Sequence, residues 1–300
     1  MARTVQIPIQ RRTWIRADLR WATFRLPLYL LLLVLTVFFG FPFFWTVSSS
    51  LKSASELRAY PPQWLPKVLQ WRNYVEVLTL FGYPFGRWFV NSIVLSTVAT
   101  LGTVVSSALG AYGFARFRFR GREALFMITL ATMMLPSQVT LIPQFLMFVR
   151  LGWLDTFKPL WVPYWFGGGA FFIFLFRQFF LTLPRELDEA ATIDGANYWR
   201  IFLTILLPLC KPALATAAMI SFMEHWSDFL NPVIYLNRSD MLTIAVGLRF
   251  MNEVPEMGAG RPILHFLMAA TVLSILPCVA VFFAGQRFFV RGIVASAIKG

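Results

Sequence analysis

The sequence predicts an all-α integral membrane protein with six transmembrane helices and both termini in the cytoplasm. Its 300 residues are 58% hydrophobic and only 14% charged. With a mean hydropathy of +0.64, the chain is more apolar than a soluble globular protein of this size. Long windows without charged residues recur along the chain, each about as long as a helix that crosses the hydrocarbon. Short basic clusters separate many of these windows.

The charge-free windows locate the spans. Four of them contain no Asp, Glu, Lys or Arg, and a fifth, 159–176, extends past Arg177. The sixth, 205–235, is apolar but carries Lys211, Glu224 and Asp228. The predicted spans cover residues 27–49, 88–114, 124–148, 159–181, 205–235 and 263–286, within a transmembrane domain of residues 27–289.

The basic residues set the orientation. If the N-terminal segment, residues 1–26, is cytoplasmic, 17 of the 27 basic residues lie in inner segments, as the positive-inside rule requires. The C-terminal tail, residues 290–300, is then cytoplasmic too. We expect the first apolar run to be a retained span, because it is too long for a signal peptide and no small-x-small cleavage site follows it.

Composition excludes several other classes of protein. The net charge of +13 is spread over clusters between apolar runs, which does not favour nucleic-acid binding. Cys210 and Cys278 lie singly in apolar runs, so we expect neither a disulfide nor a metal site. No G-x-x-x-x-G-K-[ST] loop occurs in the sequence, so the chain itself is not expected to hydrolyse ATP.

The inner loop between the fourth and fifth spans, residues 184–204, has the pattern of two short helices around a turn. Pro184 suits the first position of a helix, and the acidic residues that follow it complement the positive end of the helix dipole. Asp194-Gly195 is expected to end this helix, since glycine readily adopts the left-handed conformation found after helices. A second helix is expected to start at Tyr198 and to continue into the fifth span.

The same loop carries a spaced signature. Glu189-Ala190-Ala191 is followed by Gly195, Ile205 and Leu207-Pro208, which matches E-A-A-x3-G-x9-I-x-L-P without a gap. On this motif the chain resembles the permease subunits of ABC importers, in particular the maltose-type second permease of the carbohydrate-uptake subfamily. Further matches are Ser50 to Lys52, Asn73-Tyr74, Asn91-Ser92, the run 111–116, the run 189–196 and the run 211–214.

The resemblance implies a type I importer permease fold in a bacterial or archaeal inner membrane, translocating a sugar or related polar solute. It implies that the loop contains the coupling helices, which contact a cytoplasmic ATPase subunit. The implied partners are two such ATPases, which carry the ATP and magnesium, a second permease that forms a heterodimer with this chain, an extracytoplasmic solute-binding protein, and lipid. The implied ATPase-coupling residues are Glu189, Ala190, Ala191, Asp194, Gly195, Leu207 and Pro208.

Other polar or small residues are candidates for lining the translocation pathway. Ionisable groups in a span are costly unless they face a cavity or a partner, and an aromatic ring beside carboxylates suits a sugar. The candidates are Asn91, Gly167, Gly168, Gly169, Glu224, Trp226 and Asp228; ordinary helix packing is the alternative. By resemblance, Lys299 and Gly300 in the tail reach the ATPases, although Ser296 replaces the usual glycine.

Two other functions fit the sequence less well. A secondary transporter usually has more spans, inverted repeats and its own coupling-ion site, whereas acidic residues here gather at the outer end of one span. A membrane enzyme needs a constellation of catalytic groups, and two isolated histidines, His225 and His265, do not form one. Selectivity among sugars is expected to lie mainly in the binding protein and the other permease.

Overall fold

The computed structural model describes residues 13–79, 83–253 and 263–297 of the chain. Throughout these residues the regular secondary structure is helical, and none of them forms a strand. The predicted all-α class is therefore confirmed for the described part. Helices form because an apolar membrane leaves backbone polar groups no partner except one another.

Four helical stretches are long and apolar enough to cross a membrane. They are residues 25–50 of α1 (Thr13–Ser50), α4 (Phe85–Arg116), the run Lys158–Thr182 and residues 264–286 of α15 (Leu264–Ala297). They coincide with the predicted first, second, fourth and sixth spans. The third and fifth are bent pairs that reach the count of six only if each pair is one span.

The third predicted span is broken at Pro136. Its two halves, Arg122–Met134 and Ser137–Arg150, meet at 98°. Leu135 has an extended backbone, with ψ of 115°, because the ring of a proline disfavours helical geometry in the residue before it. The predicted span over 124–148 is therefore built from two helical halves rather than from one continuous helix. These halves comprise α5 (Arg122–Ala131), η1 (Thr132–Met134) and α6 (Ser137–Arg150).

The fifth predicted span also departs from a single helix over 205–235. A bend of 79° separates Tyr198–Leu209 from α12 (Lys211–Ser227), where Pro208 and Pro212 flank the junction and each removes a backbone donor. A non-helical residue, Asp228, ends α12. The neighbouring elements are α10 (Tyr198–Arg200), the π-helical η3 (Ile201–Leu206), α11 (Leu207–Leu209) and α13 (Leu230–Tyr235).

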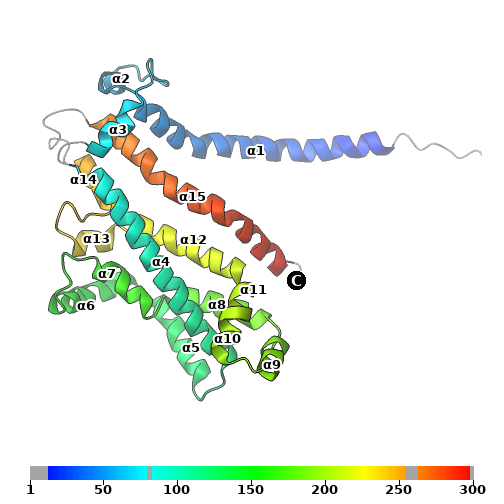
Figure 1. The fold of residues 1–300 in the computed structure, drawn as a ribbon. Coiled ribbons are helices and arrows are strands. Elements are labelled where there is room, and N and C mark those ends of the chain that lie inside the picture. The colour runs from blue at the N-terminus through cyan, green and yellow to red at the C-terminus, as the bar shows by residue number, and fades with distance from the viewer. Residues whose placement is uncertain (1–12, 80–82, 254–262, 298–300) are drawn as a thin grey trace, which may run out of the picture.

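Helix α4 is the centre of the bundle. It packs against α12 and against all three parts of the fourth span, and Figure 1 shows it running the length of the bundle. Two apolar cores lie along it, one around Trp88 at the outer end and one around Tyr112 at the inner end. The parts of the fourth span are α7 (Lys158–Trp161), η2 (Val162–Trp165) and α8 (Ala170–Thr182).

Short helices cover the outer end of the bundle. These are α2 (Ala54–Arg58), α3 (Arg72–Thr79) and α14 (Ile244–Glu253). Helix α1 meets this end and then diverges from the other helices (Figure 1). Residues 25–44 of α1 are all exposed in the single chain, although they are as apolar as a lipid-facing span requires.

Candidate functional site

The inner loop folds as the sequence predicts, with α9 (Glu186–Ile193) followed by a tight turn. Gly195 has φ of +80°, the left-handed conformation that side chains disfavour. Its N–H donates to Thr192 O at 3.0 Å, and the N–H of Ala196 donates to Ala191 O at 2.9 Å. This pair of bonds is the Schellman arrangement that closes a helix C-terminus.

The second arm of the loop begins at Asn197, which the sequence reasoning missed. Its side-chain oxygen accepts a hydrogen bond from Arg200 N at 2.8 Å, so it caps α10 in the way that favours asparagine before a helix. An Asn directly after a turn glycine was the available signal. Together the caps at Gly195 and Asn197 hold the two arms at a fixed angle.

The loop exposes a mixed face. Ala191 is buried against the inner core, whereas Glu189, Ala190 and Asp194 are exposed. Three large apolar side chains are exposed beside them, and Ile193 is 87% accessible. A hollow of about 320 Å³ opens between this face and the inner end of α4. An exposed apolar group rimmed by charge is typical of a protein contact. The three large apolar side chains exposed on this face are Ile193, Tyr198 and Trp199.

The remaining signature residues lie at the junction with the fifth span. Leu207 is half-buried and Pro208 is exposed. They precede Cys210, at which the chain turns into α12. Cys210 is buried with a free thiol, as expected for a small apolar residue. The loop and this bend are therefore one continuous unit of backbone.

A polar group lies inside the bundle near the outer end of α12. The ring of His225 meets the ring of Tyr164 edge-on with centroids 4.3 Å apart, and its Nε2 lies 3.5 Å from Thr103 Oγ1. Glu224 is exposed beside it, and Asp228 accepts from Asn231 Nδ2 at 2.9 Å. Sequence reasoning named the two carboxylates but missed Thr103 and Tyr164, because their meeting depends on the packing of three spans.

The three glycines of the fourth span break it beside this polar group. Gly168 is buried on α4, and a Cβ there would lie 2.0 Å from Ser107 Oγ and 2.7 Å from Thr103 O. Gly167, in contrast, has open space around it. Ser106 Oγ lies 2.8 Å from Tyr164 O and 2.7 Å from Gly102 O, so its one hydroxyl hydrogen is shared between a carbonyl of the fourth span and one of α4 itself. The break thus combines close packing at Gly168 with a polar contact between α4 and the end of η2 just before it.

Two predicted lining residues are placed elsewhere. Trp226 is buried, stacks on Phe222 and donates its indole N–H to Ser274 O at 3.1 Å, so its ring is not available to a sugar. The reason is helical phase, because Trp226 lies on the core side of α12. Asn91 donates to Asp240 O and Leu242 O, both at 3.0 Å, and so holds an outer loop.

A buried lysine, Lys52, holds the loop that follows α1 at the outer end of the bundle. Lys52 is 1% exposed, donates to Gln63 O at 2.5 Å and lies over the ring of Trp45, while burial lowers the pKa of its ammonium group. Beside it, backbone N–H groups of Ser53 and Lys67 hold the pKa of Glu56 below its ordinary value.

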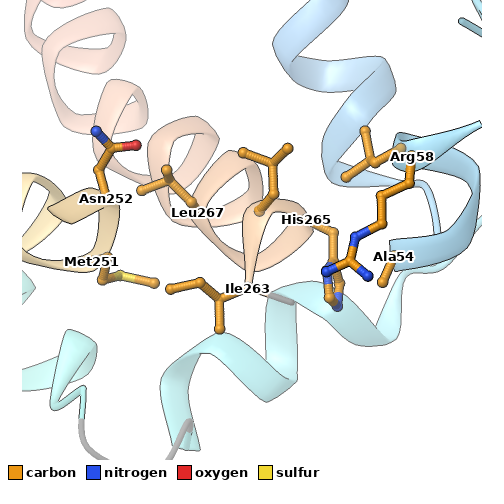
Figure 2. A pocket seen from close by; sticks show the side chains of 9 residues that line it. Ala54, Arg58, Met251, Asn252, Ile263, His265 and Leu267 are labelled. Carbon is orange, nitrogen blue, oxygen red and sulfur yellow. The ribbon is translucent and has the colours of Figure 1, made fainter. Parts of the chain in front are cut away.

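A pocket of about 260 Å³ opens next to this loop. Arg58 from α2, Asn252 from α14 and His265 from α15 reach it from three elements (Figure 2). The tail residues Lys299 and Gly300 lie outside the described residues, as do residues 254–262. Within the described residues, no cluster of His, Cys, Asp or Glu could hold a metal ion.

Solved structures share this architecture. The chain aligns over 94% of its length, and over all of the other chain, with a subunit in the crystal structure of a bacterial ABC transporter involved in the import of the acidic polysaccharide alginate, at a TM-score of 0.77 and 24% identity. A second alginate transporter structure, in complex with an alginate pentasaccharide-bound periplasmic protein, aligns at a TM-score of 0.62 over 92% of this chain and 96% of the other. The bent spans and inner loop are those of the type I ABC importer permease fold.

The sequence comparisons give the family. Residues 102–295 match the family described as binding-protein-dependent transport system inner membrane component, and the chain belongs to it. It is 36% identical to the sn-glycerol-3-phosphate transport system permease protein UgpE of Rhizobium meliloti, over 89% of this chain and 94% of that one. It is 31% identical to the arabinooligosaccharides transport system permease protein AraQ of Bacillus subtilis, over 95% and 100%. The chain is thus a multi-pass membrane permease subunit of an ABC importer.

Proposed function

We propose that this chain is one of two different permeases in an importer for an oligosaccharide or a related polar solute, driven by two cytoplasmic ATPase subunits. The observation that carries the proposal is the exposed face of α9 and α10, held around Gly195 as a rigid projection. A rigid projection can transmit a rigid-body movement that a flexible linker would absorb. In this proposal the ATPases bind ATP and magnesium, and Glu189 contacts a basic residue on one of them.

The solute class is inferred from the relatives and from the polar group in the bundle. Transport systems for arabinooligosaccharides and sn-glycerol-3-phosphate include the two relatives named above. The carboxylate of Glu224 and the half-buried polar groups of His225 and Tyr164 offer hydrogen-bond partners for hydroxyl groups. We therefore assign Glu224, Asp228 and the break at 167–169 to the translocation pathway, and remove Trp226 and Asn91 from it.

The exposure of α1 supports a second permease. An apolar helix whose residues 25–44 are exposed in the single chain needs an apolar environment. We assign this surface to lipid and the second permease, and the outer loops to the solute-binding protein on the extracytoplasmic side. The chain itself lies in the inner membrane of a bacterium or archaeon.

The proposed topology places both termini in the cytoplasm with six spans. Reporter fusions at Gly121 and Gly300 should indicate the cytoplasm, and a fusion at Met257 the periplasm. Gly121 lies in the turn between α4 and α5, whereas Met257 and Gly300 lie outside the described residues. A periplasmic signal at Gly300 contradicts the six-span topology.

A photo-crosslinker in place of Ile193 tests the ATPase contact. Ile193 is the most exposed apolar residue of the inner face, so it should crosslink to a co-purified ATPase subunit. A crosslinker at Phe119, which is exposed in the turn between α4 and α5, should not. The permease purified without partners should not hydrolyse ATP. Turnover by the isolated chain, or a crosslink from Phe119 and none from Ile193, contradicts the proposal.

The solute is found by screening the co-purified binding protein against oligosaccharides and polyol phosphates. Retention of a sugar or polyol supports the solute class. Retention of an amino acid or a metal ion alone contradicts it while leaving the coupling proposal intact.

A further inference from the structure

We propose that Arg116 is a positioning residue that fastens the coupling loop to α4, so that movement of the loop is transmitted through α4 rather than along the chain alone. The inference rests on the proposed function, since it assumes that the loop contacts an ATPase. It assigns the mechanical connection to an ion pair outside the E-A-A signature.

Arg116 holds the start of the loop at two points. Its Nε lies 2.9 Å from Asp188 Oδ2 in the first turn of α9. Its two terminal nitrogens each donate to Leu183 O at 3.3 Å, at the end of α8. The side chain of Arg116 is only 6% exposed and that of Asp188 22%. The ion pair holds the first turn of α9, and the two hydrogen bonds hold the end of α8, against the same side chain of α4.

Tyr112 holds the other arm. It lies one helical turn before Arg116, and its hydroxyl donates to Tyr198 O at 3.1 Å in α10. Its ring also packs on Phe202, with centroids 4.9 Å apart. Residues four apart share one face of a helix, so a single face of α4 contacts both arms of the loop. The loop is thereby held against α4 as a unit.

The chain offers poorer routes from the loop into the bundle. Towards α12, the path crosses the π-helical η3 and a bend of 79°. Towards α8, Leu183 has an extended backbone, with ψ of 133°. A helix bends most readily where its backbone hydrogen bonding is interrupted. The contact with α4 avoids both interruptions.

Helix α4 connects the loop to the other functional regions. It runs unbroken for 32 residues, about 48 Å at 1.5 Å per residue. Midway, Thr103 lies next to His225 in the polar group. At the outer end, the indole of Trp88 donates to Ser239 O at 2.6 Å. A displacement of the inner end of α4 therefore reaches the pathway and the outer loop through a single helix.

The ion pair of Arg116 has a matched control in the same chain. Arg177 in α8 pairs with Glu123 in α5 at 3.3 Å and is 12% exposed. Its guanidinium also lies over the ring of Phe126, so these contacts connect α8 to α5 rather than to the coupling loop. Removing Arg177 likewise takes a mostly buried guanidinium out of an ion pair between two helices, although Glu123 is 61% exposed and keeps Arg122 at 2.7 Å. Arg177→Met therefore controls for the general loss of an interhelical ion pair.

The experiment compares Arg116→Met, Asp188→Asn and Arg177→Met in the purified complex. Each variant also carries Ser227→Cys, an exposed position at the outer end of α12, which is labelled with a sulfonated maleimide. The chain without Ser227→Cys gives the background from Cys210 and Cys278. The probe is magnesium ATP with vanadate, which arrests the ATPases without requiring a solute.

In the unaltered complex and in Arg177→Met, ATP with vanadate should change the labelling rate at position 227 several-fold. In Arg116→Met this change should be lost, although the ATPases still co-purify and still hydrolyse ATP at the basal rate. Asp188→Asn should lose part of it. A variant that combines Arg116→Met with Asp188→Asn should lose no more of the labelling change than Arg116→Met alone, because both substitutions remove the same ion pair.

A full labelling change in Arg116→Met, or an equal loss in Arg177→Met, overturns the inference while leaving the coupling assignment standing. If Arg116→Met does not accumulate, the test rests on Asp188→Asn. A labelling change in Asp188→Asn as large as in the unaltered complex then overturns the inference as well. If the unaltered complex lacks ATPase subunits or shows no response, the proposed function itself fails and the inference falls with it.

Discussion

The inner loop and the fourth span each break the chain at a glycine with positive φ, yet the two breaks are built differently. Gly195 has φ of +80°, and no atom lies within 4 Å of the point that a Cβ would occupy, whereas Gly168 has φ of +53° and three atoms within 3 Å of that point. The first glycine is needed for its backbone conformation alone. The second is needed also because α4 occupies the space that a side chain would take.

The difference follows from the surroundings. Outside the membrane-spanning helices, water can solvate the backbone of a turn, so the backbone at Gly195 needs no packed partner. Within the membrane, unwound backbone must find partners inside the protein, and Ser106 supplies one to Tyr164 O. The turn at Gly195 can therefore contact a partner protein, whereas the break at Gly168 must pack against another helix of the same chain.

Gly168→Ala should have the largest effect on folding. The left-handed conformation alone costs a non-glycine residue about 1–2 kcal/mol, and the new Cβ would approach Thr103 O at 2.7 Å. The amount of monodisperse permease extracted from membranes should fall sharply. Gly167→Ala, with open space around it, should match the wild type. Equal yields for both variants would mean that the break is not packed on α4.

Ser106→Ala should have a smaller effect of the same kind. It removes the hydroxyl that lies 2.8 Å from Tyr164 O and 2.7 Å from Gly102 O, and one intramolecular hydrogen bond contributes about 0.5–1.5 kcal/mol. The thermal denaturation midpoint in detergent should fall. Thr36→Val is the control, because its hydroxyl bonds to Leu32 O within its own exposed helix. A midpoint that falls only in Thr36→Val contradicts the role given to Ser106.

Glu189→Ala should have the smallest effect, and only on coupling. The carboxylate is exposed, and an exposed ion pair with a partner is worth up to about 1 kcal/mol. ATPase affinity should weaken a few-fold, with normal permease levels. Glu186→Ala removes another exposed carboxylate from the same helix and should leave that affinity unchanged. Equal weakening in both would indicate a general effect of charge.

The positions of four long helices and of the turn at Gly195 were predictable from local sequence. Charge-free windows mark the helices, and Asp194-Gly195 marks the turn, because both depend on neighbouring residues. The bends at Pro136 and Cys210 were not assigned, since prolines occur in straight membrane helices as well. Whether a proline kinks its helix depends on what packs beside it.

The side chains that meet across elements were harder to predict. Trp226 was assigned to the pathway, yet it packs in the core while Glu224 is exposed, because a span apolar on most sides does not reveal its phase. The sequence places Arg116 among the inner basic residues and in the run 111–116 that resembles the family, but it does not indicate a partner for its side chain. Its pairing with Asp188 joins residues 72 positions apart, which single-sequence patterns do not specify.

The central claim, that the loop around Gly195 couples the permease to ATP hydrolysis, is tested most directly by Gly195→Asp. A side chain there must adopt positive φ, and its charge lies beside Asp194. Gly121→Asp is the matched control, because Gly121 also has positive φ and open space, but lies in the turn between α4 and α5. In reconstituted complexes, solute-stimulated ATPase activity and uptake should be lost in Gly195→Asp and kept in Gly121→Asp, at equal permease levels. Transport at the wild-type rate by normally expressed Gly195→Asp would contradict the account.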